Sequence, residues 1–163
     1  MKTLLRTLLY LALVVWVGAE IFIPEVAATT FGTLRSDTHA AGTIVGHLLR
    51  TLHGAGLVCG VILLGLLALA PAWNIYKPRT VLAPMILVLL MMLSTAYSQF
   101  IVIPAMERDR IAAGGAIDAS DPTNQYTADF NKLHNQSFNL EMVTLLLGIA
   151  AVVMVARAET ARA

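Results

Sequence analysis

Apolar residues are concentrated in four blocks of the chain, each long enough to cross a bilayer as a helix. The blocks run from about Leu4 to Ile23, Thr51 to Ala70, Thr80 to Ile103 and Ser137 to Ala156. A helix needs about 20 mainly apolar residues to cross the hydrocarbon core of a membrane. The third block has no charged residue, and the fourth has one, Glu141. The pattern predicts an all-α, polytopic membrane protein with a bundle of four transmembrane helices.

The segments between the blocks carry helix signals of their own. Ser36 or Asp37 is placed to cap a helix that continues into the second block, because apolar residues keep helical spacing after it. Asp121-Pro122 is a similar start signal ahead of the fourth block. We therefore expect the second and fourth helices to begin inside the two outer loops, 24–50 and 104–136.

The composition excludes several classes of protein. Hydrophobic residues make up 58% of the 163 residues and charged residues 13%, whereas an average soluble domain has about 45–50% and about 25%. The formal net charge is +1, so no basic surface is available to bind nucleic acid. A single cysteine, Cys59, excludes an internal disulfide and a cysteine-cluster zinc site. We expect one transmembrane domain, residues 1–163, in contact with the lipid bilayer.

Lysine and arginine are distributed unevenly between the flanks of the blocks. The N-terminus, the 71–79 turn and the C-terminus hold six bases and one acid, whereas the two outer loops hold five bases and seven acids. Bases in short flanks favour the cytoplasmic side. The distribution predicts a plasma or inner membrane protein with both termini in the cytoplasm. Trp73 and Tyr76 in the short turn suit the inner headgroup belt.

The two halves of the chain resemble each other. Ile21-Phe22-Ile23-Pro24 ends the first block and Ile101-Val102-Ile103-Pro104 ends the third. Leu52-His53 opens the second block, and Leu133-His134 lies at the start of the fourth. Such a repeat predicts two duplicated hairpins that run in the same direction. It would place His53 and His134 at the same depth, on opposite sides of the bundle.

Ionisable residues inside an apolar layer are costly and therefore mark functional sites. Glu20 and Glu141 are the two acidic examples. His134, Ser137 and Glu141 are spaced i, i+3 and i+7, which places them on one face of the last helix. Together with Glu20 and His53, they predict an outward-facing polar cluster.

This cluster has two interpretations. His53 and His134 would serve as paired ligands, with Glu141, for haem iron, copper or zinc. Alternatively, the histidines hydrogen-bond neighbouring groups and bind no metal, and Glu141 accepts a hydrogen bond from His134 or Ser98. Glu20 would then reach the outer headgroups by snorkelling.

Two stretches, Pro104–Arg108 and Phe130–Leu140, resemble the transmembrane protein 205-like family. That family shows a Pro and a Glu-Arg pair after its third span, and a Phe…His-x-x-Ser-x-x-Asn-Leu signature at the start of its last helix. The matching positions in this sequence are Arg108, His134, Ser137 and Asn139. The resemblance implies a small four-span membrane protein and no established biochemical activity.

A looser likeness connects the chain to copper-resistance membrane domains and to haem-linked four-span proteins. It consists of Leu52-His53 and Trp16-Val17-Gly18. The likeness implies handling of a metal ion or haem.

Three functions follow from these observations. The first is a non-enzymatic membrane protein that binds a partner or small ligand through the polar cluster. The second is metal ion or haem handling or transport at the outer leaflet, and the third is a haem-dependent membrane redox enzyme. Gly42-x-x-x-Gly46 and the series Gly54, Gly56, Gly60 permit close helix approach. Their spacing favours packing inside the bundle over a contact in a homo-oligomer or with a membrane protein partner, and both alternatives stay open.

Overall fold

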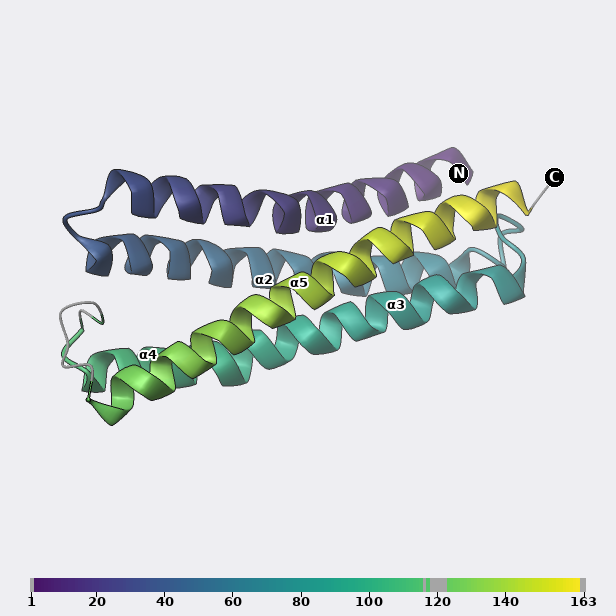
Figure 1. The fold of residues 1–163 in the computed structure, drawn as a ribbon. Coiled ribbons are helices and arrows are strands. Elements are labelled where there is room, and N and C mark those ends of the chain that lie inside the picture. The colour runs from purple at the N-terminus through teal and green to yellow at the C-terminus, as the bar shows by residue number, and fades with distance from the viewer. Residues whose placement is uncertain (1, 116, 118–122, 162–163) are drawn as a thin grey trace.

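A computed structural model describes residues 2–115, 117 and 123–161, and these form four long helical segments packed lengthwise into a bundle (Figure 1). The segments are α1 (Lys2–Thr33), α2 (Thr38–Leu69), a continuous run of α3 (Pro78–Tyr97), η1 (Ser98–Val102) and α4 (Ile103–Ala112), and α5 (Gln125–Thr160). Each segment is long and apolar enough to cross a membrane. The predicted all-α bundle of four transmembrane helices is confirmed.

The bundle consists of two helical hairpins. One is formed by α1 and α2, and the other by the α3–α4 run and α5. The start of α1 and the end of α5 lie at one end of the bundle, next to the turn between α2 and α3, and we call this the termini end (Figure 1). The connection between α1 and α2 lies at the opposite end, which we call the loop end. Both hairpins therefore open in the same direction.

The helices are longer than their apolar blocks. α2 begins at Thr38, where Asp37 Oδ1 accepts a hydrogen bond from the Ala40 amide at 2.9 Å. The Asp37 cap predicted from the sequence is thus confirmed. α5 begins at Gln125, after the cap residue Asn124, whereas the expected start signal Asp121-Pro122 lies outside the described residues. At 1.5 Å per residue, α2 extends about 20 Å before its apolar block.

The first and third helical segments continue past the prolines that end their apolar blocks, Pro24 and Pro104. α1 continues through Pro24 to Thr33, and the third segment continues through Pro104 to Ala112. A proline removes one backbone hydrogen bond from a helix, but neighbouring helices and local adjustments compensate in membrane bundles. The outer segments 24–50 and 104–136 are therefore mostly helical among their described residues.

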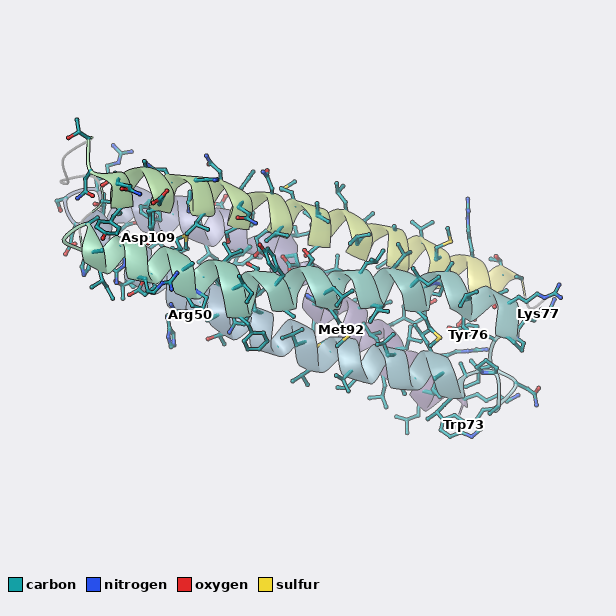
Figure 2. The ribbon with its side chains drawn as sticks, turned by 90° about the horizontal axis from the view of Figure 1, so that it is seen from below. Arg50, Trp73, Tyr76, Lys77, Met92 and Asp109 are labelled. Carbon is teal, nitrogen blue, oxygen red and sulfur yellow. The ribbon has the colours of Figure 1, made fainter. Side chains whose placement is uncertain are left out.

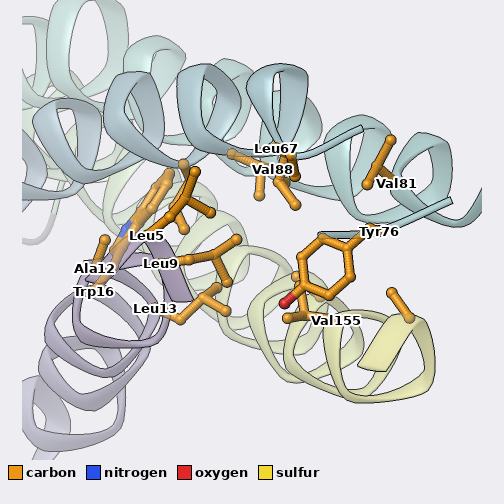
Figure 3. Packing of buried hydrophobic residues seen from close by; sticks show 14 of the residues in the cluster. Leu5, Leu9, Ala12, Leu13, Trp16, Leu67, Tyr76, Val81, Val88 and Val155 are labelled. Atoms are coloured by element: carbon orange, nitrogen blue, oxygen red, sulfur yellow. The ribbon is translucent and has the colours of Figure 1, made fainter. Parts of the chain in front are cut away.

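An apolar core fills the bundle toward the termini end (Figure 3). In Figure 3, it extends from Trp16 on one side to Tyr76 on the other. All four long segments contribute to it, through Leu5, Leu9, Leu13, Leu63, Leu67, Val88, Met91, Ala151 and Val155. Methionines are well suited to fill irregular gaps of this kind. Thr144 of α5 is a polar side chain buried beside this core, at 1% exposure.

Two glycines of α2 leave the space that the indole ring of Trp16 occupies. A Cβ added at Gly56 would lie 2.5 Å from Trp16 Nε1, and one added at Gly60 would lie 3.0 Å from Trp16 Cζ3. By contrast, a Cβ at Gly54 or Gly46 would meet nothing within 4 Å. The expected close helix approach therefore occurs at Gly56 and Gly60.

Replacing Gly56 is the direct test of this packing. Gly56→Ala should lower the thermal stability of the detergent-purified protein, because the added methyl group overlaps the indole ring, at a cost of about 1–3 kcal/mol. Gly54→Ala is the matched control and should be neutral or slightly stabilising, since alanine favours helices. Equal melting temperatures for the two variants would contradict the packing.

A group of polar side chains joins the helices at the termini end, where Figure 2 shows Tyr76 near Trp73 and Lys77. Tyr76 is 3% exposed and its hydroxyl donates to Glu159 Oε1 at 2.7 Å. Arg6 Nε lies 3.3 Å from the same oxygen. Tyr76 is therefore a buried bridge between the α2–α3 turn and α5. Burial, with the carboxylate of Glu159, raises the pKa of the Tyr76 phenol.

Tyr76 should make stability sensitive to alkaline pH. Its ordinary pKa is 10.0, so above this pH the unfolded chain releases a proton that the folded protein retains, and folding is disfavoured. The wild-type melting temperature should fall more steeply than that of Tyr76→Phe between about pH 8 and about pH 11. Parallel melting curves would contradict the buried phenol.

Candidate functional site

Five polar side chains meet inside the bundle, on the loop-end side of Trp16. They come from all four helical segments and form what we call the polar cluster: Glu20 on α1, His53 on α2, Ser98 and Gln99 on η1, and Glu141 on α5. The sequence predicted Glu20, His53 and Glu141 as members of one cluster near this end of the apolar blocks.

His53 is the centre of the polar cluster. Its side chain is 0% exposed, and its two ring nitrogens face side chains from two different helices. Nδ1 lies 3.2 Å from Gln99 Oε1, and Nε2 lies 2.7 Å from Glu141 Oε1. Both neighbours are oxygen acceptors, so a ring that carries a proton on each nitrogen satisfies both contacts. His53 therefore ties α2 to η1 and to α5.

Glu20 is buried beside the His53–Glu141 pair, so it does not snorkel to the headgroups as expected. It is 2% exposed, and Trp16 Nε1 donates to its Oε1 at 3.2 Å. Its Oε2 has no donor among the described residues, and its carboxyl group faces that of Glu141. Two carboxyl groups form a hydrogen bond with each other only when one of them carries a proton. The carboxyl groups of Glu20 and Glu141 are close enough for their charges to interact.

Hydroxyl groups of the third segment complete the surroundings. Ser98 Oγ donates to Glu141 Oε1 at 3.5 Å, as the sequence predicted for Ser98. Ser94 Oγ donates to the carbonyl of Leu140 at 3.3 Å. One turn from Ser98, Thr95 Oγ1 is buried without a partner in the described part of the chain. Buried polar atoms are normally satisfied, so this region has unused hydrogen-bonding capacity.

The π-helical turn η1 presents Ser98 and Gln99 to the polar cluster. Its five residues precede Pro104 closely, and a proline ring clashes with the carbonyl four residues before it, here that of Phe100. Widening the preceding turn relieves such a clash, and single π turns are frequent at functional sites. The sequence gave one indication of this irregularity, the proline itself.

Trp16 is a site residue that the sequence named only through the Trp16-Val17-Gly18 likeness, without a place in the polar cluster. Its indole shields Glu20 on one side and donates the hydrogen bond described above. The spacing of Trp16 and Glu20, i and i+4 on one helix, is the signal that identifies such a pair.

The structure does not bring His134 into the polar cluster. Its ring is exposed and stacks on Phe130, with 6.1 Å between the ring centroids. α5 crosses the bundle at an angle and leaves α1 on the way to the loop end (Figure 1), so a residue about two turns beyond Glu141 no longer faces inward. The expected pairing of His53 with His134 across the bundle is therefore wrong.

Some of the other predicted positions are buried in the bundle and others are exposed. Ser137 is 4% exposed and faces the bundle, whereas Arg108 and Asn139 are exposed. Within residues 2–115, 117 and 123–161, no three His, Cys, Asp or Glu side chains are arranged to hold a metal ion. His53 and Glu141 are the predicted ligands that do lie in contact.

Comparison with known proteins identifies the family. Residues 11–111 match a domain of unknown function, DUF4149, which is more than half of the chain. The chain belongs to the DUF4149 family. No curated protein and no solved structure matches the chain. The DUF4149 segment contains Glu20, His53 and Gln99, whereas Glu141 lies beyond it, on α5.

The two histidines should respond differently to substitution. His53→Ala removes the ring that contacts both Gln99 and Glu141, and breaking a buried ion pair typically costs about 3–5 kcal/mol. The variant should melt well below the wild type in detergent. His134→Ala is the matched control and should lose far less, since its ring is exposed. A larger loss for His134→Ala would contradict the assignment of His53 as the centre of the cluster.

Proposed function

We propose that this DUF4149 protein is a non-enzymatic integral membrane protein whose small ligand is the proton, bound at the polar cluster. One observation carries the proposal. Glu20 of α1 faces Glu141 of α5, and Glu141 contacts His53 of α2 at 2.7 Å, with Glu20 and His53 buried and Glu141 16% exposed. The number of bound protons would set how closely α1 packs against α5.

Charge balance supports the proton as the ligand. With both glutamates ionised and His53 neutral, the cluster would hold two negative charges in a medium where each isolated charge is very costly. One proton on His53 and one shared by the two carboxyl groups bring the total to zero. The same two protons supply the donors for Gln99, Glu141 and Glu20. A ligand of this size needs no cavity, which agrees with the burial of His53 and Glu20.

The apolar core determines from which side protons arrive. Between the polar cluster and the termini end, the centre of the bundle is filled by the residues of the core (Figure 3). A continuous path across the membrane would need polar groups there. We therefore propose that the cluster exchanges protons with the loop end, and that the protein binds protons without transporting them.

The long helices offer a way to transmit the change. α1 and α5 run without interruption from the cluster to the loop end. Loss of the shared proton would leave two carboxylates facing each other, and like charges at this distance repel. The repulsion would separate α1 from α5 and alter the surface that the loop end presents to a partner, such as a second membrane protein or another copy of the chain.

Two finer assignments belong to the same proposal. The excess of bases at the termini end supports a cytoplasmic position for both termini, and hence an outer position for the loop end. The Glu107-Arg108 pair and the signature around His134 support kinship with transmembrane protein 205-like proteins.

Metal or haem handling is less well supported by the geometry. Both ring nitrogens of His53 already contact protein oxygens, so coordination of iron or copper would require breaking one of these contacts. The exposed His134 offers no second ligand at the cluster. A haem-dependent redox activity would depend on the same two histidines.

The proton can be detected directly in the infrared spectrum of protein in liposomes. We expect a difference spectrum between about pH 5 and about pH 8 to contain the carbonyl band of a buried carboxylic acid. Glu20→Gln should remove this band. Glu25→Gln, an exposed glutamate on the same helix, should retain it. An unchanged spectrum in Glu20→Gln would refute the proton site.

The predicted movement has a separate readout. Spin labels at the exposed positions Ala28 and Asn131, in a Cys59→Ser background, report the separation of α1 and α5 at the loop end. The distance should increase with pH in the wild type and stay constant in Glu20→Gln. A pH-independent distance in the wild type would refute the coupling but leave the bound proton in place.

A further inference from the structure

A second polar feature lies at the loop end, separate from the polar cluster. It is a pocket of about 120 Å³ between the start of α2 and α4. Its lining residues are Gly42, Thr43, Gly46, His47, Arg50, Glu107 and Arg110. We call it the loop-end pocket. None of these residues belongs to the polar cluster.

Two glycines of α2 create the space. A Cβ at Gly46 would meet no atom within 4 Å, and one at Gly42 would meet only the edge of Phe31, at 4.0 Å. The Gly42-x-x-x-Gly46 pair therefore leaves a hollow where the sequence suggested close helix packing. A side chain at either position would project into open space.

The acid in the pocket wall is already paired. Arg110 holds Glu107 with two hydrogen bonds, from Nε at 2.9 Å and from Nη2 at 2.7 Å. The remaining Arg110 nitrogen, Nη1, lies 2.7 Å from His39 Nδ1 and donates to the carbonyl of Gly115 at 3.3 Å. Both side chains are thereby fixed, and their charges cancel.

Arg50 brings a second positive charge to the pocket, close enough to Glu107 for the two charges to interact. In the described part of the chain, its guanidinium group forms no hydrogen bond or ion pair, and the ring of His47 forms none either. Both line the loop-end pocket, so the pocket has a net positive charge and free donors. Guanidinium groups bind phosphate oxygens through paired hydrogen bonds. The pocket is therefore suited to an anion.

Position and size indicate which anion. Arg50 directly precedes the apolar block that starts at Thr51, which is the depth of lipid headgroups. The volume is several times the share of a water molecule in liquid, about 30 Å³. We propose that the loop-end pocket binds a phosphate group through Arg50 and His47, carried by an anionic phospholipid or by a free phosphate compound.

Calorimetric titration of the delipidated protein in detergent tests the site. The two probes are inorganic phosphate and phosphatidic acid in mixed micelles, and diacylglycerol is the phosphate-free control. We expect saturable binding of at least one phosphate probe and none of diacylglycerol. Binding of both probes would identify the phosphate group alone as the ligand, and binding of phosphatidic acid alone would identify a lipid headgroup.

Variants separate a built site from general attraction. Arg50→Gln should weaken binding about tenfold or more, since it removes a charge-assisted contact. Gly46→Leu keeps every charge but fills the hollow, and should also abolish binding. Arg35→Gln removes an exposed arginine outside the pocket and should bind as the wild type does. Wild-type affinity in both Arg50→Gln and Gly46→Leu, or an equal loss in Arg35→Gln, would overturn the proposal.

Discussion

The contact between His53 Nε2 and Glu141 Oε1, 2.7 Å long, joins two helices inside a bundle whose other central contacts are largely apolar. In a membrane interior, a polar side chain without a protein partner loses its hydrogen bonds altogether. The pair therefore fixes the rotation of α2 and α5 about their axes, because turning either helix would expose a charged group to lipid. Gln99 follows from this arrangement, since its Oε1 satisfies the His53 ring nitrogen that the pair leaves open.

The sizes of the facing residues divide the bundle into a tightly packed part toward the termini end and a more open part toward the loop end. Toward the termini end, Gly56 and Gly60 admit Trp16 against α2, and the apolar core closes the centre. Toward the loop end, α5 diverges from α1 (Figure 1), and Gly42 and Gly46 leave a hollow. Glycine thus permits close packing where a large side chain lies opposite, and leaves a hollow where none does. Trp16 marks the boundary, with Glu20 beyond it.

The loop end combines features that suit communication with the surroundings. Figure 2 shows Arg50 and Asp109 toward this end of the molecule, opposite Tyr76 and Lys77. The bidentate contact between Arg110 and Glu107 stiffens α4 beside the loop-end pocket. A change at the polar cluster would reach this end through α1, which crosses Pro24 without a break. A phosphate-bearing ligand at the loop-end pocket and a proton at the polar cluster would then act on neighbouring parts of the same helix bundle.

The number of helices, their apolar blocks and the membership of Glu20, His53 and Glu141 in one cluster were determined by the sequence alone, because length, hydropathy and the cost of buried charge are local properties. The continuation of helices through Pro24 and Pro104, the buried role of Tyr76 and the exposure of His134 were decided by the tertiary structure. These depend on which helix lies opposite and at what angle it crosses. Helical periodicity places His134 and Glu141 on one face, but Glu141 faces His53 of α2 whereas His134 is exposed, since α5 diverges from α1 toward the loop end (Figure 1).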